Sequence, residues 1–271
     1  MLSTRRTSTF CTGLVFALSF ALGRLTAQPP RSSRPAHRST DYATTGADVH
    51  NTSGVQCYAR RMCPSVLRGS RLSADYDDFF KKFGGDKTRY SYHTYLTQNS
   101  LVVEVGGYTG VDIKKMRQLH GPFKTLLFEP VFHDEARLNL DGLDVVVYPY
   151  GLGATTRSTA FKIKGDATRP TKRGTLAEIR QVSDVISELD ITHVDLLQIN
   201  CEGCEWEVLE SVLKAEQCHI FHHIQVQFHA GVDWVENRLE RYAIIQDRLT
   251  ETHELLYDQP WIWQLWRSKS Y

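Results

Sequence analysis

The chain has 271 residues, of which 41% are hydrophobic and 23% charged, so a packed globular core is expected. The net charge of +1 gives no electrostatic basis for binding nucleic acid. Residues 1–38 contain six arginines and no acidic residue. The rest of the chain therefore contains 26 of the 32 basic residues and all 31 acidic residues. That part therefore carries a net charge of −5, which argues against a polyanionic substrate.

The N-terminal residues have the features of a targeting segment. Arg5 and Arg6 precede an uncharged apolar run at residues 10–23. This run is shorter than the roughly 20 residues that span a bilayer, so residues 1–27 are predicted to form a signal peptide. A short, uncleaved membrane anchor is the alternative. Either interpretation places the remainder in the secretory pathway, secreted or in the Golgi or ER lumen, with type II topology if the segment is retained.

Residues 28–72 are rich in Ser, Arg, Pro and Thr and are predicted to form a flexible linker or stem. Asn51 begins an Asn-Thr-Ser glycosylation acceptor within it. In an oxidising compartment, Cys57 and Cys63 are the expected disulfide partners because they are close in sequence. Pairing cannot be deduced from sequence alone.

Residues 73–271 are predicted to form the main domain, in which apolar strands alternate with amphipathic helices. Strands are expected at residues 101–105, 125–128, 145–148, 194–199 and 224–228. Helices are expected at residues 111–119, 132–138, 176–189, 205–213 and 232–249. The last two strands, around 255–257 and 261–266, are expected to form a terminal hairpin.

This alternation predicts an α/β fold with a mostly parallel sheet covered on both faces. A seven-stranded, Rossmann-like sheet finished by a C-terminal antiparallel hairpin is the arrangement expected of a class I methyltransferase.

The first candidate site follows the strand at 101–105, where the sequence is Glu-Val-Gly-Gly-Tyr-Thr-Gly from Glu104 to Gly110. Glycines let the backbone turn sharply and approach a ligand closely. Their spacing does not match the dinucleotide fingerprint Gly-x-Gly-x-x-Gly. Glu129 ends the next strand, 19 residues after Gly110. A carboxylate there can accept hydrogen bonds from both hydroxyls of a ribose.

The second candidate site is the turn after the strand at 194–199. Ligands of open α/β sheets bind at the carboxyl ends of the strands, so Asn200 and Glu202 should face the crevice. Glu205 begins the following helix, where a carboxylate also stabilises the helix dipole.

The segments VVEVGGYTG, LLFEP and DLLQINCEGCEWEVLE resemble those of FkbM-type methyltransferases, in particular a eukaryotic secreted branch of that family. The resemblance covers roughly residues 95–230. It implies S-adenosylmethionine (SAM) as methyl donor and a hydroxyl or carboxylate oxygen as acceptor, often on a sugar or small metabolite.

The resemblance also implies roles for individual residues. The methionine part of SAM would be lined by Glu104, Gly106, Tyr108 and Gly110. Glu129 would bind the ribose, and Leu152, Gly153 and Ala154 would lie near the adenine. The segment beside the methyl group would contain Asn200, Glu202 and Glu205.

Three positions depart from the family pattern by losing a charge. Asn200 stands where the family usually has Asp, Gln198 where Lys is common, and Gln227 where Glu is common. An amide cannot act as a base. His229, at the end of the fifth strand, is therefore the first candidate for the base that activates a hydroxyl, and Glu202 is the second. The alternative for His229 is a hydrogen bond to the backbone.

The sequence therefore predicts a SAM-dependent O-methyltransferase acting on a glycan or small molecule. A catalytically silent methyltransferase fold that recognises a glycan or protein is the main alternative, and a dinucleotide-dependent oxidoreductase is a third. No metal site is expected, because the Cys201-x-x-Cys204 pair and the later residues His219, His222 and His223 lack a second well-spaced pair.

Overall fold

The computed structural model describes residues 87–271 except 216, 230 and 260–261. The chain divides into two units, Met1–Gly46 and Ala47–Tyr271, and every described residue belongs to the second. The predicted signal segment, the linker, the glycosylation acceptor at Asn51 and the Cys57–Cys63 pair lie outside the described residues. Within them, no helix combines the length and the hydrophobicity needed to cross a membrane.

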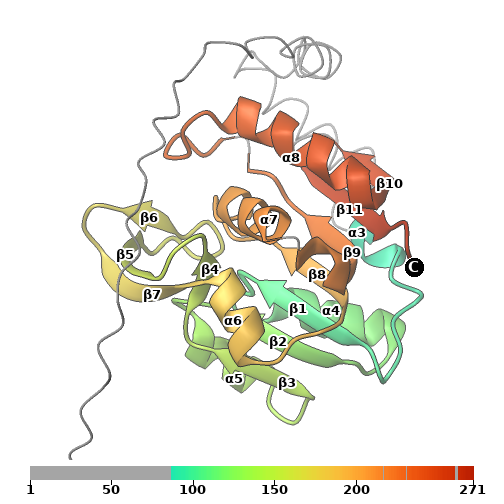
Figure 1. Cartoon of the computed structure of the whole chain (residues 1–271). Helices are drawn as coiled ribbons and strands as arrows, with labels where there is room; N and C mark the ends of the chain where they lie inside the picture. The colour runs from blue at the N-terminus through green and yellow to red at the C-terminus, as the bar shows by residue number, and fades with distance from the viewer. Residues whose placement is uncertain (1–86, 216, 230, 260–261) are drawn as a thin grey trace, which may run out of the picture. The chain divides into compact units, whose positions relative to one another are not determined.

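The central feature is a seven-stranded sheet with the order β10-β11-β9-β8-β1-β2-β3 (Figure 1). Its strands are β1 (Leu101–Val105), β2 (Lys124–Phe128), β3 (Val145–Tyr148), β8 (Val194–Ile199), β9 (Phe221–Val226), β10 (His253–Gln259) and β11 (Trp263–Ser268). The pairs from β9 through β3 are parallel, whereas β11 runs antiparallel to both β9 and β10. This order confirms the predicted Rossmann-like class I methyltransferase sheet with its C-terminal hairpin.

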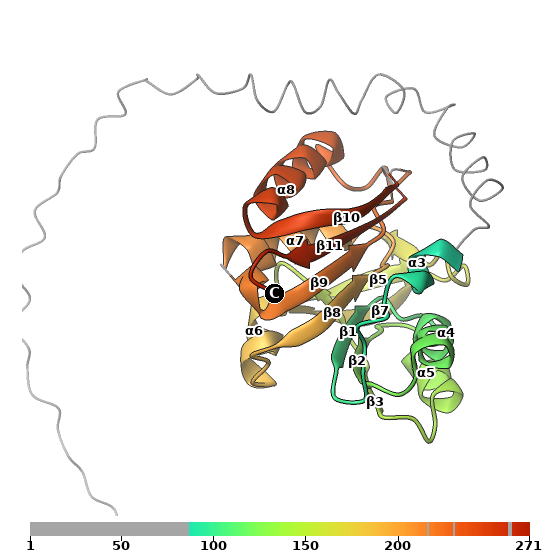
Figure 2. The ribbon, with the colours of Figure 1, turned by 90° about the vertical axis from the view of Figure 1, so that its right-hand side faces the viewer.

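Helices cover both faces of this sheet (Figure 2). They are α3 (Lys87–Ser91), α4 (Val111–His120), α5 (His133–Asn139), α6 (Val182–Glu188), α7 (Glu205–Lys214), α8 (Arg238–Thr252) and a short 3-10 helix η1 (Gln217–Ile220). Side chains of α6, α7 and α8 share one core cluster with Val103 and Val105, and those of α3, α4 and α5 share another with Val102. Because adjacent strand residues pack alternately into the two clusters, the central strands are mostly apolar on both faces, with buried polar residues such as Glu104 and Gln198 as exceptions.

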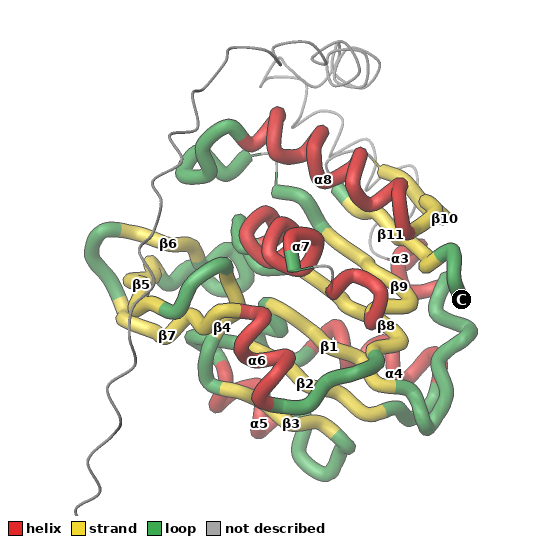
Figure 3. The backbone as a smooth tube through the Cα atoms, in the orientation of Figure 1, coloured by secondary structure: helices red, strands yellow, loops and turns green. Residues whose placement is uncertain are grey.

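A second, four-stranded sheet with the order β4-β7-β5-β6 stands beside the first (Figure 3). Its strands are β4 (Gly151–Gly153), β5 (Arg157–Lys162), β6 (Arg169–Thr171) and β7 (Thr175–Gln181). The prediction of a single helix at residues 176–189 was wrong, because its first half is β7. Leu176, which completes the apparent helical stripe, is 71% exposed, and β5 supplies an antiparallel partner instead.

The helix predicted at residues 232–249 was wrong at its start, since α8 begins at Arg238. Asn237 has a φ of +50°, a left-handed conformation that interrupts the helix. Trp234 and Val235 therefore precede α8, in a segment that lines the cavity described next.

Candidate active site

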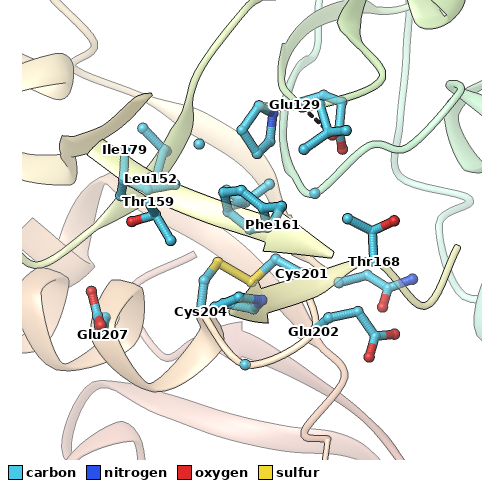
Figure 4. Close-up of a pocket in the computed structure, with 18 of the residues that line it drawn as sticks. Glu129, Leu152, Thr159, Phe161, Thr168, Ile179, Cys201, Glu202, Cys204 and Glu207 are labelled. Carbon is cyan, nitrogen blue, oxygen red and sulfur yellow. Dashed lines mark hydrogen bonds between the residues drawn. A yellow bond between two sulfur atoms is a disulfide. The ribbon is translucent and has the colours of Figure 1, made fainter. Parts of the chain in front are cut away.

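A cavity of about 380 Å³ opens at the carboxyl ends of the parallel strands. The turns after β1, β2 and β8 form one part of its wall, and β4, β5 and β7 of the small sheet form another (Figure 4). The carboxyl edge is where open α/β sheets bind ligands, and the volume lies in the range of small-molecule sites. The small sheet that the sequence did not reveal therefore completes the pocket.

The glycine turn after β1 lies at this wall, and Gly106 is required there. Its φ is +83°, and a Cβ atom would stand 2.2 Å from the carbonyl oxygen of Asn200. Gly106 donates its N–H to Phe128 O (2.9 Å), and Asn200 donates its N–H to Val105 O (2.9 Å). Gly106, Asn200 and Tyr108, which the sequence assigns to SAM binding, all line the cavity. Gly110 does not line it; a Cβ there would instead meet Leu140.

Glu129 lies at the end of β2 and lines the cavity while being only 6% exposed. One carboxylate oxygen accepts the N–H of Tyr108 (2.9 Å), and the other accepts those of Val131 (2.8 Å) and Phe132 (3.1 Å). Burial raises the pKa of Glu129, although these three hydrogen bonds oppose the shift. A carboxylate has about four lone-pair sites, so Glu129 fixes the two turns and retains capacity for a ligand hydroxyl.

Glu104 is not among the residues that line the cavity, so its predicted contact with SAM stays a prediction. It is 1% exposed and lies in register with Gln198, which in turn is in register with Gln225. Gln225 Nε2 donates to Gln198 Oε1 (3.1 Å), and Gln198 Nε2 donates to Glu104 Oε1 (3.2 Å). Burial, with Asp112 nearby, raises the pKa of Glu104 well above its usual value. The amide at Gln198 therefore links three strands instead of lining the cavity.

This buried polar row continues into the helices that precede and follow β1. Gln198 Nε2 also donates to Asp112 Oδ2 (3.3 Å), and Arg89 binds both oxygens of Asp112 (2.8 and 2.9 Å). At the other end, His93 Nε2 lies 3.0 Å from Gln225 Oε1. Sequence reasoning missed the row, because its hydrogen-bonded partners lie as far apart in the chain as His93 and Gln225, which are separated by 132 positions.

His229 follows β9 and is bracketed by two carboxylates. Its Nδ1 lies 3.0 Å from Glu205 Oε1, and its Nε2 lies 3.1 Å from Glu202 Oε1. Burial alone would lower the pKa of His229, but the charges and hydrogen bonds of Glu205 and Glu202 outweigh it and raise the pKa to about 10. An imidazolium has no free lone pair. The pairing therefore favours a positioning role for His229 over the predicted role as base.

The two glutamates differ in their access to the cavity. Glu202 lines it, with a side chain 28% exposed and a φ of +53°. Glu205 is fully buried, and besides His229 it accepts the N–H of Gly203 (2.8 Å), so it fixes the turn that carries Glu202. Of the two predicted bases, Glu202 is the one that faces the pocket.

Cys201 and Cys204 form a disulfide in the same turn, and both line the cavity (Figure 4). From the sequence, we considered this Cys-x-x-Cys spacing only as a metal motif and did not predict the bond. With both sulfurs in the disulfide, neither is a thiolate ligand for zinc. Cys218 is the free cysteine of the described residues, and it is buried.

Leu152, which the family resemblance places near the adenine, lines the cavity. Phe161 and Ile179, also in the small sheet, line it as well. Gly153 does not line it, because its backbone approaches Glu207: a Cβ there would lie 2.8 Å from Glu207 Oε2. Glu207 accepts the N–H of Ala154 (3.1 Å) and pairs with Arg157 (2.9 Å). An ion pair thus anchors the small sheet to α7.

No family model matches the chain, and no curated protein matches it. Its FkbM-type membership therefore remains a resemblance. Solved structures do match. A TehB-like SAM-dependent methyltransferase from Corynebacterium glutamicum is 16% identical, with 81% of this chain and 100% of that chain covered and a TM-score of 0.36.

The human methyltransferase 10 domain containing protein is 12% identical, with 80% and 99% covered and a TM-score of 0.36. The METTL16 MTase domain is 10% identical, with 80% and 90% covered and a TM-score of 0.38. The fold assignment rests on the strand order and on the position of the glycine turn, not on these scores.

Proposed function

We propose that this chain binds SAM in the cavity and transfers its methyl group to an oxygen of a glycan or small molecule. The observation that carries the proposal is the convergence of Gly106, Glu129 and Asn200 on one cavity at the carboxyl ends of β1, β2 and β8. Each residue comes from a different turn, and each turn follows a parallel strand.

The cavity suits the parts of SAM by its chemistry. The backbone at Gly106 and Tyr108 would contact the methionine part of SAM, and Glu129 would accept a hydrogen bond from the ribose. Leu152 and Ile179, which line the cavity, would provide apolar contacts for the adenine. Of the described residues that line the cavity, four are acidic and two are arginines, a balance that favours the sulfonium cation.

When bound, SAM would supply an electrophilic methyl group. Glu202 would accept the proton of the attacking hydroxyl, since its carboxylate faces the cavity. His229 would hold Glu202 in place through Nε2, and Glu205 would hold His229 through Nδ1. Alignment of acceptor and donor supplies much of the remaining rate enhancement.

A catalytically silent binding module is the second candidate. His229 is held as an imidazolium and Asn200 is an amide, so neither supplies a base. In that case the cavity would recognise a ligand without methyl transfer.

We also propose that the protein acts in the secretory pathway. The proposal rests on the targeting features of residues 1–27, and the disulfide of Cys201 and Cys204 supports it, since disulfides persist mainly in oxidising compartments. Whether the segment is cleaved or retained as an anchor would decide between a secreted and a luminal enzyme.

The test is a methyl-transfer assay with methyl-labelled SAM and a panel of hydroxylated acceptors, in particular glycans. The wild-type chain should label an acceptor, and Glu202→Gln should reduce turnover by about 10²–10⁴-fold with little change in SAM affinity. Glu188→Gln, which alters a glutamate 54% exposed on α6, is the matched control and should keep full activity. SAM binding without transfer to any acceptor would favour the silent module.

A further inference from the structure

A second group of polar side chains lies at the opposite end of the central sheet from the cavity. His193 immediately precedes β8, Asp195 is its second residue, and His222 is the second residue of β9. The register pairs Val194 with Phe221 and Leu196 with His223, so Asp195 and His222 lie side by side between these pairs. Two strands therefore bring three potential metal ligands to one point.

The geometry of the three side chains is close to that of a coordination site. One ligand atom from each of them lies within 4.8 Å of the other two, and among the described residues this is the one such group. His193 Nε2 is 3.2 Å from Asp195 Oδ1. Two ligands of a tetrahedral zinc ion, each bound at about 2.0–2.1 Å, are separated by about 3.3 Å.

The surroundings hold these side chains in position. Asp195 Oδ2 accepts the N–H of Leu101 (2.8 Å), which fixes the carboxylate from its other side. The ring of His222 packs against those of His193 and Tyr271, at centroid distances of 4.1 and 4.2 Å. Outer contacts of this kind orient the ligands of natural metal sites.

One buried atom of the group has no partner. His222 Nδ1 is shielded from solvent, and no described residue forms a hydrogen bond with it. Buried polar atoms of native proteins are nearly always satisfied, and an exception calls for an explanation such as an ion. His193, whose side chain is 48% exposed, leaves a route from solvent to the group.

We propose that His193, Asp195 and His222 bind a divalent transition-metal ion of the zinc class. Two imidazoles and one carboxylate suit zinc and its neighbours, whereas magnesium and calcium prefer sites made of oxygen ligands alone. Three protein ligands leave one tetrahedral position for water or another ligand.

The site is distinct from the proposed methyl-transfer cavity. Five residue steps along β8 separate Asp195 from Asn200, which is about 17 Å at ~3.3 Å per residue. The ion would connect the amino ends of β8 and β9, and it would not contact SAM. Failure of the metal proposal would therefore leave the proposed function untouched, and the reverse also holds.

The experiment is a calorimetric titration of zinc chloride into the purified full chain after removal of metal with EDTA. We expect one equivalent to bind, with affinity reduced at least about 10-fold in both His193→Ala and His222→Ala. The exposed His193 makes the first variant safe for folding. His133→Ala, which removes a half-buried histidine of α5, is the control and should bind as wild type does.

Cobalt provides a second readout, because a tetrahedral Co²⁺ site absorbs visible light and should do so in wild type and His133→Ala only. The proposal is overturned if wild type binds no zinc. It is equally overturned if either ligand variant retains wild-type affinity, or if His133→Ala loses as much as they do.

Discussion

Raising the pH should destabilise the folded chain through His229. Burial of His229 lowers its pKa, but Glu205 and Glu202 outweigh this effect and raise the pKa to about 10. A histidine in the unfolded chain has a pKa near 6.5. Between these values the folded state holds one more proton than the unfolded state. The stabilisation is fully present below pH 6.5 and is lost as the pH rises to about 10, at about 1.4 kcal/mol per pH unit.

Urea titrations at pH 7, 8 and 9 measure this loss, with His229→Gln as the comparison. Wild type should lose about 1.4 kcal/mol per pH unit more than the variant does. At pH 7 the variant should already be less stable by about 3–5 kcal/mol, because it leaves the fully buried carboxylate of Glu205 without its cationic partner. The double variant Glu205→Gln/His229→Gln removes that buried charge and should recover part of the loss.

His253→Gln is the matched control, since His253 is also buried, at 1% exposure. Burial lowers the pKa of His253, so it is neutral in both states above pH 6.5, and its variant should keep the alkaline slope of wild type. Equal slopes for wild type and His229→Gln would refute the reasoning. They would mean that His229 is neutral near pH 7 and able to act as the base after all.

Other substitutions test the cavity, the glycine turn and the disulfide separately. Glu129→Gln should weaken SAM binding by about 1–3 kcal/mol in calorimetry, through loss of charge-assisted hydrogen bonds; unchanged affinity would place the ribose elsewhere. Gly142→Ala should cost about 1–2 kcal/mol in thermal melting, since its φ is +76° but no atom lies within 4 Å of a Cβ. Gly106→Ala should cost about 1–3 kcal/mol more than Gly142→Ala, because its Cβ would collide with the backbone of Asn200. Equal losses of stability in the two variants would contradict the close approach of the turns after β1 and β8. Alkylation of the native, unreduced chain should leave Cys201 and Cys204 unlabelled, and replacing both should cost no more than about 2 kcal/mol, because the loop is short.

The sequence was sufficient for the parts of the fold that depend on local pattern. The buried strands of the central sheet are short apolar runs, and the terminal hairpin is marked by its turn. Gly106, Glu129 and Asn200 were found because each directly follows a strand, and the carboxyl ends of parallel strands meet at one edge.

The remaining features depend on contacts between distant residues. Strand β7 fits a helical stripe by spacing, and its pairing with β4 and β5 makes it a strand. The charge state of His229 depends on Glu205 and Glu202, which lie 24 and 27 positions earlier in the chain. Periodicity along the sequence carries no information on such pairs.

Calorimetric titration of SAM, and of its demethylated product, into the purified full chain tests whether the cavity binds the methyl donor. We expect one equivalent to bind with micromolar affinity or better, and Glu129→Gln to bind more weakly. A sample that melts cooperatively yet binds neither compound would contradict the assignment of the cavity to SAM.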